Sequence, residues 1–277
     1  MFFLATKVGI LRLQASRLIK LGALIALLID GYIEVRWKFP RWSETQRAQA
    51  VQHWARRALA VLGIEIEING ESNQDGEGNA GLTVQGPLML VSNHLSWLDI
   101  LVFLALAPVR FVSKSEVASW PLVGRYARAC RTLFIERSSR RDVSRMVERL
   151  AQALSDQDVV MIFPEGTTST GEEVLTFHAN LLQAPLQSGA RVQALALVYR
   201  IENTRELTRV PCFVGDQTLV ASIWAILGLE RFVAQILWGL PKETGQNDRR
   251  ALAKALHLEV SQLLHELKGE TASSGKG

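Results

Sequence analysis

Two short segments of the sequence carry residue types that could do chemistry. Residues 93–99 place an imidazole, His94, five positions before a carboxylate, Asp99, at the end of an apolar run. Residues 163–169 form a polar turn around Gly166 that follows a second apolar run. A base beside a carboxylate, facing a glycine turn rich in hydrogen-bond donors, is suited to moving an acyl group onto a hydroxyl.

The pair of His94 and Asp99 allows two interpretations. A carboxylate partner would fix the tautomer of the imidazole, orient the ring and stabilise the imidazolium. Because an imidazole titrates near neutral pH, it could then take a proton from an attacking hydroxyl. Ser96 and Asp99 also have the spacing of a capping box, and in that case Asp99 would only serve a helix start and His94 would be a bystander.

Further polar residues follow two other predicted strands. Residues 131–137 end in an arginine, with Arg140 and Arg141 close behind, which suits a phosphate ligand or a solvated helix start. Gly166 permits a turn whose N–H groups could face a developing oxyanion. Glu165 could bind an acceptor hydroxyl, or it could simply cap this turn.

These residues need a scaffold, and the sequence predicts alternating strands and helices. The predicted strands are 63–70, 88–92, 109–113, 132–135, 159–163, 192–199 and 232–238. The predicted helices are 43–62, 97–106, 140–155, 178–187, 218–229 and 247–268. This alternation is typical of an α/β fold with a mixed, largely parallel sheet flanked by helices. His94 would lie beyond the carboxyl end of strand 88–92, where open α/β sheets bind ligands.

The chain divides into three parts: residues 1–42, a catalytic domain over 43–270 and a disordered tail over 271–277. Ser43 and Gln46 form a capping box at the start of the domain, and Asn247 is expected to cap its last helix. A glycine-rich loop over 71–81 formally matches a dinucleotide-binding pattern. We reject that match because no strand leads directly into the loop and no helix leaves it.

The first 42 residues are predicted to form amphipathic helices that associate with a membrane. Basic residues are scattered among leucines: Lys7, Arg12, Arg17 and Lys20. The uncharged stretch 21–29 is much shorter than the roughly 20 apolar residues of a spanning helix. Basic residues beside leucines favour a helix lying in the membrane interface, and the alternative is a helix packed on the protein's own core. Three aromatic residues suited to headgroup level follow: Trp37, Phe39 and Trp42.

The composition narrows the class of function. Hydrophobic residues make up 48% of the 277 residues and charged residues 21%, as in ordinary globular proteins. The net charge of +4 allows nucleic acid or an anionic bilayer as a partner, but no zinc module, aromatic RNA-binding motif or dense lysine stripe supports nucleic acid. Two cysteines indicate neither a disulfide framework nor a metal site.

The ordered set Asn93-His94-x4-Asp99, Phe134-Ile135-x-Arg137 and Phe163-Pro164-Glu165-Gly166-Thr167 resembles the glycerolipid acyltransferase family, and in particular the bacterial 1-acylglycerol-3-phosphate acyltransferases. The resemblance implies that His94 is the general base and Asp99 its orienting partner. It places Lys114, Arg137, Glu165, Gly166 and Thr167 in substrate binding.

The same resemblance implies an acyl-CoA or acyl-carrier-protein donor, a lysolipid acceptor and a peripheral, monotopic seat on the cytoplasmic face of the inner membrane. The expected product is phosphatidic acid, made from 1-acylglycerol-3-phosphate, and neither a metal nor a cofactor is expected.

The chain departs from the family pattern at three places, and the change at Thr168 leaves the acceptor open. Residues 192–197 lack the proline that the family usually carries in this strand. Arg131 stands where the family usually has glycine, and Thr168 stands where it has an arginine that binds phosphate. Arg131, Arg137 or Arg140 could replace that charge, or the acceptor could be a lyso-aminolipid such as lyso-ornithine lipid. A hydrolase and a non-enzymatic membrane-surface lipid-binding protein are the remaining alternatives.

Overall fold

The computed structural model describes residues 2–69, 86–136, 139–245 and 248–269. Four sequence predictions therefore lie outside the described residues: the loop at 71–81, Arg137, the cap at Asn247 and the tail 271–277. The described last helix begins after Asp248, whose carboxylate accepts from the backbone N–H groups of Arg250 and Ala251 and so caps the helix.

In the part of the chain that the structure describes, seven strands form one sheet in the order β1-β7-β6-β2-β5-β3-β4. The strands are β1 (Ile64–Asn69), β2 (Leu88–Ser92), β3 (Val109–Lys114), β4 (Leu133–Ile135), β5 (Val159–Ile162), β6 (Arg191–Ile201) and β7 (Phe232–Trp238). Neighbouring strands are parallel except for β6 and β7, which are antiparallel. The predicted mixed, largely parallel sheet is confirmed.

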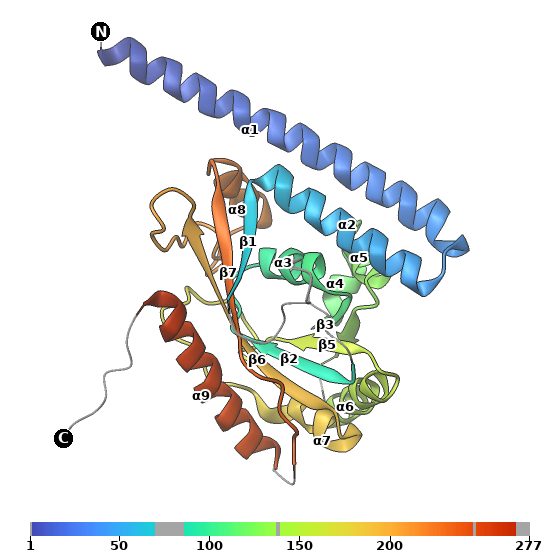
Figure 1. Cartoon of the computed structure of the whole chain (residues 1–277). Coiled ribbons are helices and arrows are strands. Elements are labelled where there is room, and N and C mark those ends of the chain that lie inside the picture. The colour runs from blue at the N-terminus through green and yellow to red at the C-terminus, as the bar shows by residue number, and fades with distance from the viewer. Residues whose placement is uncertain (1, 70–85, 137–138, 246–247, 270–277) are drawn as a thin grey trace, which may run out of the picture.

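Helices cover both faces of the sheet (Figure 1). They are α1 (Phe2–Ile33), α2 (Glu44–Leu62), α3 (Leu98–Leu106), α4 (Ser115–Ser119), α5 (Val123–Ala129), α6 (Arg140–Ser155), α7 (Gln183–Ser188), α8 (Leu219–Leu227) and α9 (Arg249–Lys268). A π-helical turn η1 (Glu34–Lys38) and a 3-10 turn η2 (Phe39–Arg41) join α1 to α2, and a 3-10 turn η3 (Ala179–Leu182) precedes α7.

The core has two halves because side chains of a strand alternate between the two faces of the sheet. Leu90 of β2 packs in a cluster with Leu59 and Phe103 of the helices on one face. The next residue, Val91, packs in a second cluster with Leu150 and Leu256 of the helices on the other face. The whole of β2 is buried, so the turn that follows it starts from a fixed point.

Most predicted elements are present, and the differences are local. All seven predicted strands are found, and the capping box of Ser43 and Gln46 is confirmed at the start of α2. The helix predicted over 178–187 is a 3-10 turn that continues into α7. The short helices α4 and α5 were not predicted.

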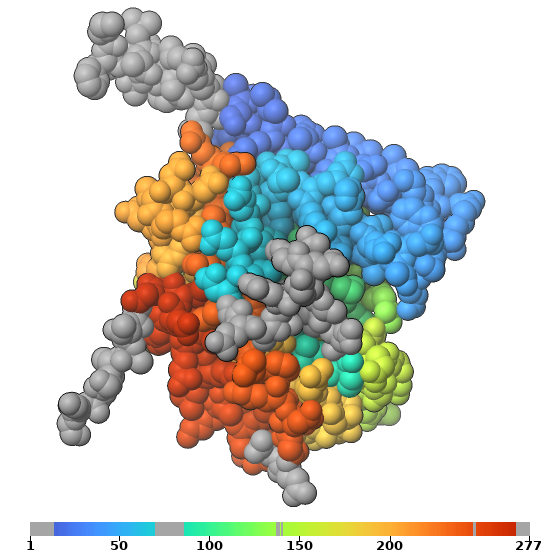
Figure 2. Space-filling model, viewed as in Figure 1, coloured from blue at the N-terminus to red at the C-terminus, as the bar shows by residue number. Residues whose placement is uncertain are grey.

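The N-terminal helix α1 packs against α2 and α8 at one end of the molecule (Figures 1 and 2). Its contact face includes two buried leucines, Leu24 and Leu27. Arg17 and Lys20 also turn toward the protein: Arg17 lies over the ring of Trp224, and Lys20 donates to the carbonyl of Leu229 at 2.8 Å.

The opposite face of α1 is apolar and exposed, and its large side chains are Leu18, Ile19, Ile25, Ile29 and Ile33. Arg17 and Lys20 therefore do not lie on the outer face of this helix, where a simple interfacial helix would carry them. No helix within the described ranges is both long and apolar enough to cross a bilayer.

Candidate active site

The turn after β2 is anchored to the neighbouring strand by a buried side chain. The side-chain amide of Asn93 donates to the carbonyl of Leu197 at 3.0 Å and accepts from its N–H at 2.9 Å. This pair of bonds replaces one step of the ladder between β2 and β6. It fixes the chain direction at the carboxyl end of β2, where His94 follows.

The backbone of His94 connects the two sequence motifs. Its N–H donates to the carboxylate of Glu165 at 2.9 Å, and its carbonyl accepts from the N–H of Ser169 at 2.8 Å. Residues 163–169 follow β5, which lies next to β2 in the sheet. The turn expected to bind the oxyanion is therefore attached directly to the residue expected to be the base.

Asp99 orients the imidazole and also serves the start of α3. Its Oδ2 accepts from Nδ1 of His94 at 2.8 Å and from the backbone N–H groups of Leu95 and Ser96 at 2.7 and 3.0 Å. The bond from Ser96 is one half of a capping box, and the residue has no solvent exposure. Asp99 therefore both orients the imidazole and stabilises the start of α3.

Tyr199 completes the shell around Asp99, and the sequence analysis missed it. Its hydroxyl donates to the other carboxylate oxygen, Oδ1, at 2.7 Å across the sheet from β6. Burial and the nearby carboxylate raise the pKa of Tyr199 well above its usual value, so it remains a donor. In the sequence, the only feature that could have pointed to Tyr199 is a tyrosine at the end of the predicted apolar strand 192–199.

The ring of His94 stacks on Phe163, with centroids 4.0 Å apart and planes 7° from parallel. The His94 side chain is 19% exposed while that of Asp99 is fully buried, so the imidazole lies between the core and solvent. With Nδ1 held by Asp99, Nε2 has no hydrogen-bond partner among the described residues. That nitrogen is therefore available to a substrate.

Glu165 is buried and bonded to backbone on both oxygens, since Oε2 accepts from the N–H of Leu175 at 3.2 Å. Burial raises the pKa of Glu165 to about 7, against the opposing effect of the hydrogen bonds from the N–H groups of His94 and Leu175. These bonds hold residues 163–175 against the catalytic turn. Glu165 therefore has the structural role that the sequence analysis gave as the alternative to binding an acceptor hydroxyl.

The turn at Gly166 has the backbone conformation that the sequence predicted. Gly166 has φ +71°, in the left-handed region, and its N–H donates to the carbonyl of Phe163 at 3.1 Å. That N–H is therefore used within the turn. The next two N–H groups, of Thr167 and Thr168, have no hydrogen-bond partner in the described part of the chain.

The hydroxyl of Thr168 is used in a hydrogen bond within the protein. It donates to the carbonyl of Phe213, whose own N–H donates to the carbonyl of Leu95 at 2.8 Å. The connection between β6 and α8 is thus fastened beside His94. Ser222 on α8 adds a second link, because its hydroxyl accepts from the indole N–H of Trp97 at 3.0 Å.

Two of the cations singled out in the sequence, Lys114 and Arg131, lie at opposite edges of the sheet. Lys114 ends β3 at the same edge of the sheet as His94, and its side chain is exposed. Arg131 instead pairs with Asp158, at 3.1 Å, just before the start of β5. Since β2 and β5 are parallel, Asp158 marks the amino edge of the sheet, opposite His94. Arg131 therefore does not supply charge at the catalytic edge.

An oriented imidazole beside free backbone donors, at the carboxyl edge of a sheet, is the arrangement of an enzyme for acyl transfer or hydrolysis. The model of the family described as Acyltransferase matches residues 65–198. Lyso-ornithine lipid O-acyltransferase of Pseudomonas aeruginosa is 35% identical over 246 residues, covering 88% of this chain and 89% of that protein. 1-acyl-sn-glycerol-3-phosphate acyltransferase of Neisseria meningitidis is 30% identical over 208 residues, with coverages of 75% and 77%.

The fold has a counterpart of known structure. The crystal structure of the 1-acyl-sn-glycerophosphate acyltransferase of Thermotoga maritima matches with a TM-score of 0.66 at 20% identity, over 95% of this chain and 99% of that one. The chain belongs to the acyltransferase family and is an acyltransferase of lipid metabolism. The family resemblance read from the sequence is confirmed, and so is the fold class.

Proposed function

We propose that the protein transfers a fatty acyl group from an acyl thioester to the free hydroxyl of a lysolipid. The observation that carries this proposal is the bond from Nδ1 of His94 to the buried carboxylate of Asp99, 2.8 Å long. With Nδ1–H donated to Asp99, Nε2 of the neutral imidazole has a lone pair that can accept a proton at the catalytic edge. An oriented base of this kind has no purpose in a protein that only binds lipid.

In the proposed mechanism, Nε2 of His94 takes the proton of the lysolipid hydroxyl as the oxygen attacks the thioester carbonyl. Asp99 stabilises the imidazolium that forms. The N–H groups of Thr167 and Thr168 receive the negative charge on the carbonyl oxygen. When the intermediate collapses, the carbon–sulfur bond breaks, the imidazolium returns the proton to the thiolate, and an ester and a free thiol leave. Apart from the acyl donor, the scheme needs no cofactor or metal.

For the acceptor, the structure favours a lyso-aminolipid such as lyso-ornithine lipid over 1-acylglycerol-3-phosphate. Thr168 brings no charge to this turn, because a hydroxyl is neutral, and its hydrogen is already donated to the carbonyl of Phe213. Arg131 lies at the opposite edge, paired with Asp158. The absence of positive charge from these two residues would weaken the binding of a phosphate monoester more than that of a less charged headgroup. The named relatives of P. aeruginosa and Rhizobium meliloti, at 35% and 29% identity, are both lyso-ornithine lipid acyltransferases.

A specific observation keeps 1-acylglycerol-3-phosphate as the second candidate. Lys114 is exposed at the carboxyl end of β3, two strands from β2 along the same edge. An ammonium group there is placed to attract a phosphate or a carboxylate. We propose that Lys114 contacts the acceptor headgroup, and that Arg137, which follows β4, assists it.

We also propose that the enzyme sits on the cytoplasmic face of the inner membrane through the exposed face of α1. Leu18, Ile19, Ile25 and Ile29 are between 49% and 73% exposed, and their side chains form one apolar face. A contiguous apolar surface of this kind is typical of a site that contacts lipid or another protein. Trp37, which is 58% exposed, follows at headgroup level.

The test is transfer of a labelled acyl group by purified protein in neutral detergent micelles, with lyso-ornithine lipid and 1-acylglycerol-3-phosphate offered in parallel. Acyl-CoA and acyl-carrier protein are compared as donors. We expect faster transfer to lyso-ornithine lipid, and we expect His94→Ala to lower the rate by about 10³-fold or more with either acceptor.

His53→Ala is the matched control, because His53 lies exposed on α2 and bonds to no described group. Substantial transfer by His94→Ala would rule out the base. Equal rates of hydrolysis with and without an acceptor would make the protein a thioesterase. Clear preference for 1-acylglycerol-3-phosphate would contradict the proposed role of Thr168 and favour Lys114 as a sufficient phosphate ligand.

A further inference from the structure

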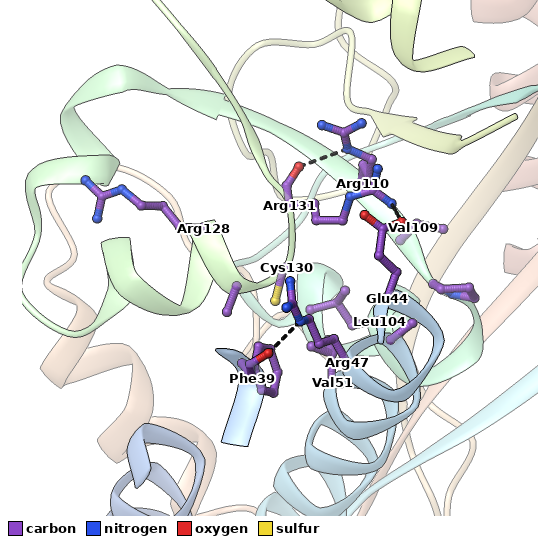
Figure 3. Close-up of a pocket in the computed structure, with 13 residues that line it drawn as sticks. Phe39, Glu44, Arg47, Val51, Leu104, Val109, Arg110, Arg128, Cys130 and Arg131 are labelled. Carbon is purple, nitrogen blue, oxygen red and sulfur yellow. Dashed lines mark hydrogen bonds and ion pairs between the residues drawn. The ribbon is translucent and has the colours of Figure 1, made fainter. Parts of the chain in front are cut away.

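A cavity of about 190 Å³ lies at the amino edge of the sheet, away from His94 (Figure 3). It is enclosed by the end of η1–η2, by α2, by the connection from α3 to β3 and by the end of α5. Four arginines line it: Arg47, Arg110, Arg128 and Arg131. No role in acyl transfer falls to any of them, because they are at the opposite edge from the catalytic turn.

The charges around this cavity do not balance. Asp158 binds Arg110 at 2.5 Å and Arg131 at 3.1 Å, and Glu44 lies 3.6 Å from Arg131. Four guanidinium groups against two carboxylates leave a surplus of two positive charges. Glu44 is also 75% exposed and its contact is long, so it neutralises Arg131 poorly.

Arg47 offers the donors that an anion needs. Its Nε donates to the carbonyl of Phe39 at 2.8 Å, and this bond holds the Arg47 side chain against η2. Its two terminal NH₂ groups have no partner among the residues that the structure describes. Figure 3 shows Arg47, Arg110 and Arg131 near Glu44, with Arg128 standing apart on α5. A guanidinium with free, parallel N–H groups is suited to bind phosphate.

The backbone at Arg131 has a conformation that disfavours its side chain. Arg131 has φ +56°, in the left-handed region that glycine adopts most easily. Its carbonyl accepts from Nε of Arg110 at 3.0 Å, so the strained residue also positions a second arginine of the cavity. The positive φ is therefore found at an arginine that lines the cavity.

A largely apolar crevice adjoins the arginine cavity, and its one charged lining residue in the described part of the chain, Glu34, pairs with Lys38 at 2.9 Å. Four residues line both: Phe39, Val51, Ala129 and Cys130. Beyond them the crevice runs between α1–η1 and α5, past Val35 and Trp54. Burial raises the pKa of the Cys130 thiol to about 12, so it adds no negative charge to the wall. A phosphate site beside an apolar crevice has the chemistry of a lipid with a charged head and an acyl chain.

We propose that this cavity binds the phosphate group of an anionic phospholipid of the membrane, with the first carbons of one of its acyl chains at the adjoining crevice. The proposal rests on the membrane seat argued above for α1. The chain that leaves the exposed apolar face of α1 passes through Trp37 and forms the cavity wall at Phe39, so lipid at the seat is next to the cavity. This site is distinct from the acceptor site at His94.

The test measures binding by full-length protein of dihexanoyl phosphatidylglycerol, dihexanoyl phosphatidylcholine and inorganic phosphate, by calorimetry in neutral detergent. The variant is Arg47→Gln with Arg131→Gly, which removes two guanidinium groups and gives position 131 the residue its backbone favours. The control is Arg249→Gln with Arg250→Gln, which removes the same charge from exposed positions on α9.

We expect wild type and control to bind the phosphatidylglycerol more tightly than the phosphatidylcholine or phosphate. The Arg47/Arg131 variant should bind the phosphatidylglycerol about tenfold or more weakly, since two charge-assisted contacts are lost. Its melting temperature should not fall, and its acyl transfer in micelles should be unchanged.

Equal affinity of variant and wild type, or no binding of the phosphatidylglycerol by wild type, would overturn the proposal. Phosphate bound as tightly as the lipid would show a site for free phosphate and would overturn the assignment to a phospholipid. If wild-type protein binds the phosphatidylglycerol but transfers no acyl group, that result would count only against the proposed function. The two ideas can therefore fail separately.

Discussion

The carboxylate of Asp99 accepts four hydrogen bonds, and the one from Tyr199 is the only one that crosses the sheet. Three donors fix Oδ2, and the phenol fixes Oδ1. The plane of the carboxylate, and with it the direction of the His94 ring, therefore depends on a side chain from β6. Tyr199 is a positioning residue, because it acts on the substrate only through Asp99 and His94.

Replacement of Tyr199 by Phe tests this role. The variant leaves one oxygen of a fully buried carboxylate without a partner, at a cost of about 1–3 kcal/mol. We expect kcat to fall about tenfold while KM for the lysolipid stays unchanged, because the lost bond orients the base and does not bind the acceptor.

Tyr126→Phe is a close control for that experiment. Tyr126 is half-buried, and its hydroxyl donates to a backbone carbonyl, that of Leu28 on α1. Its loss should lower the melting temperature without lowering kcat. If kcat is retained in Tyr199→Phe, or if it falls equally in both variants, the positioning role of Tyr199 is wrong.

Whether a residue of the site could be predicted depends on how close its partner lies in the sequence. His94 and Asp99 lie within one turn of chain, so their spacing alone predicted that they could meet. Tyr199 is 100 residues from its partner, and a pairing across the sheet leaves no local pattern. Phe163 was within a recognised motif, but its stacking on the imidazole depends on the register of β5 against β2.

At the scale of elements, hydrophobic patterns predicted the strands well and the short helices poorly. A buried strand such as β5 is an apolar run between polar turns, and it can be recognised alone. α4 and α5 have five and seven residues, fewer than two full turns, so a helical period is not visible in them. Trp120 and Pro121 between them add a break.

The orientation of α1 could not be predicted from its sequence because its partners are distant. Arg17 and Lys20 look like the polar face of an interfacial helix, yet they face Trp224 and the carbonyl of Leu229. Burial lowers the pKa of Lys20, against the attraction of Glu230. The apolar side chains are left outside, which strengthens the case for a bilayer on that face.

Substitution of three exposed residues of α1 tests the membrane seat. Ile19→Gln, Ile25→Gln and Ile29→Gln together change the outer face and leave the packing of Leu24 and Leu27 on the protein intact. Each buried isoleucine side chain contributes about 1.5–3 kcal/mol, so the triple variant should lose most of its binding to vesicles. Sedimentation with phosphatidylglycerol-containing vesicles measures this.

Removing the whole helix would be a poorer test, because the indole of Trp54 donates to the carbonyl of Leu27 and would lose its partner. Leu258→Gln is a suitable control, since Leu258 is 53% exposed on α9. Undiminished vesicle binding by the triple variant would place the membrane contact elsewhere on the molecule, and α8 with its exposed Val220 would be examined next.

At the scale of the whole molecule, the catalytic edge joins segments from β2, β5, β6 and α8. Glu165 is central to this assembly because it bonds to the N–H groups of both His94 and Leu175. Its carboxyl group is buried, and its pKa is raised to about 7. The protonation of one side chain is therefore coupled to the folding of the entire domain.

The sign of this coupling follows from the direction of the shift. Between its usual pKa, 4.5, and about 7, Glu165 is protonated in the folded protein and ionised in the unfolded chain. The folded state binds more protons over this range, so the stability due to Glu165 is fully present below pH 4.5 and is lost as the pH rises through about 7. The change is on the order of 3 kcal/mol.

Glu165→Gln removes this titration while retaining a side chain of similar shape. We expect the free energy of unfolding of wild type, measured relative to Glu165→Gln by urea denaturation, to decrease as the pH rises from 4.5 to 7.5. Glu173→Gln, an exposed neighbour on the same segment, should run parallel to wild type over that range. Parallel curves for wild type and Glu165→Gln would mean that Glu165 ionises normally in the folded protein. In that case the protonation of Glu165 would not affect the stability of the folded domain.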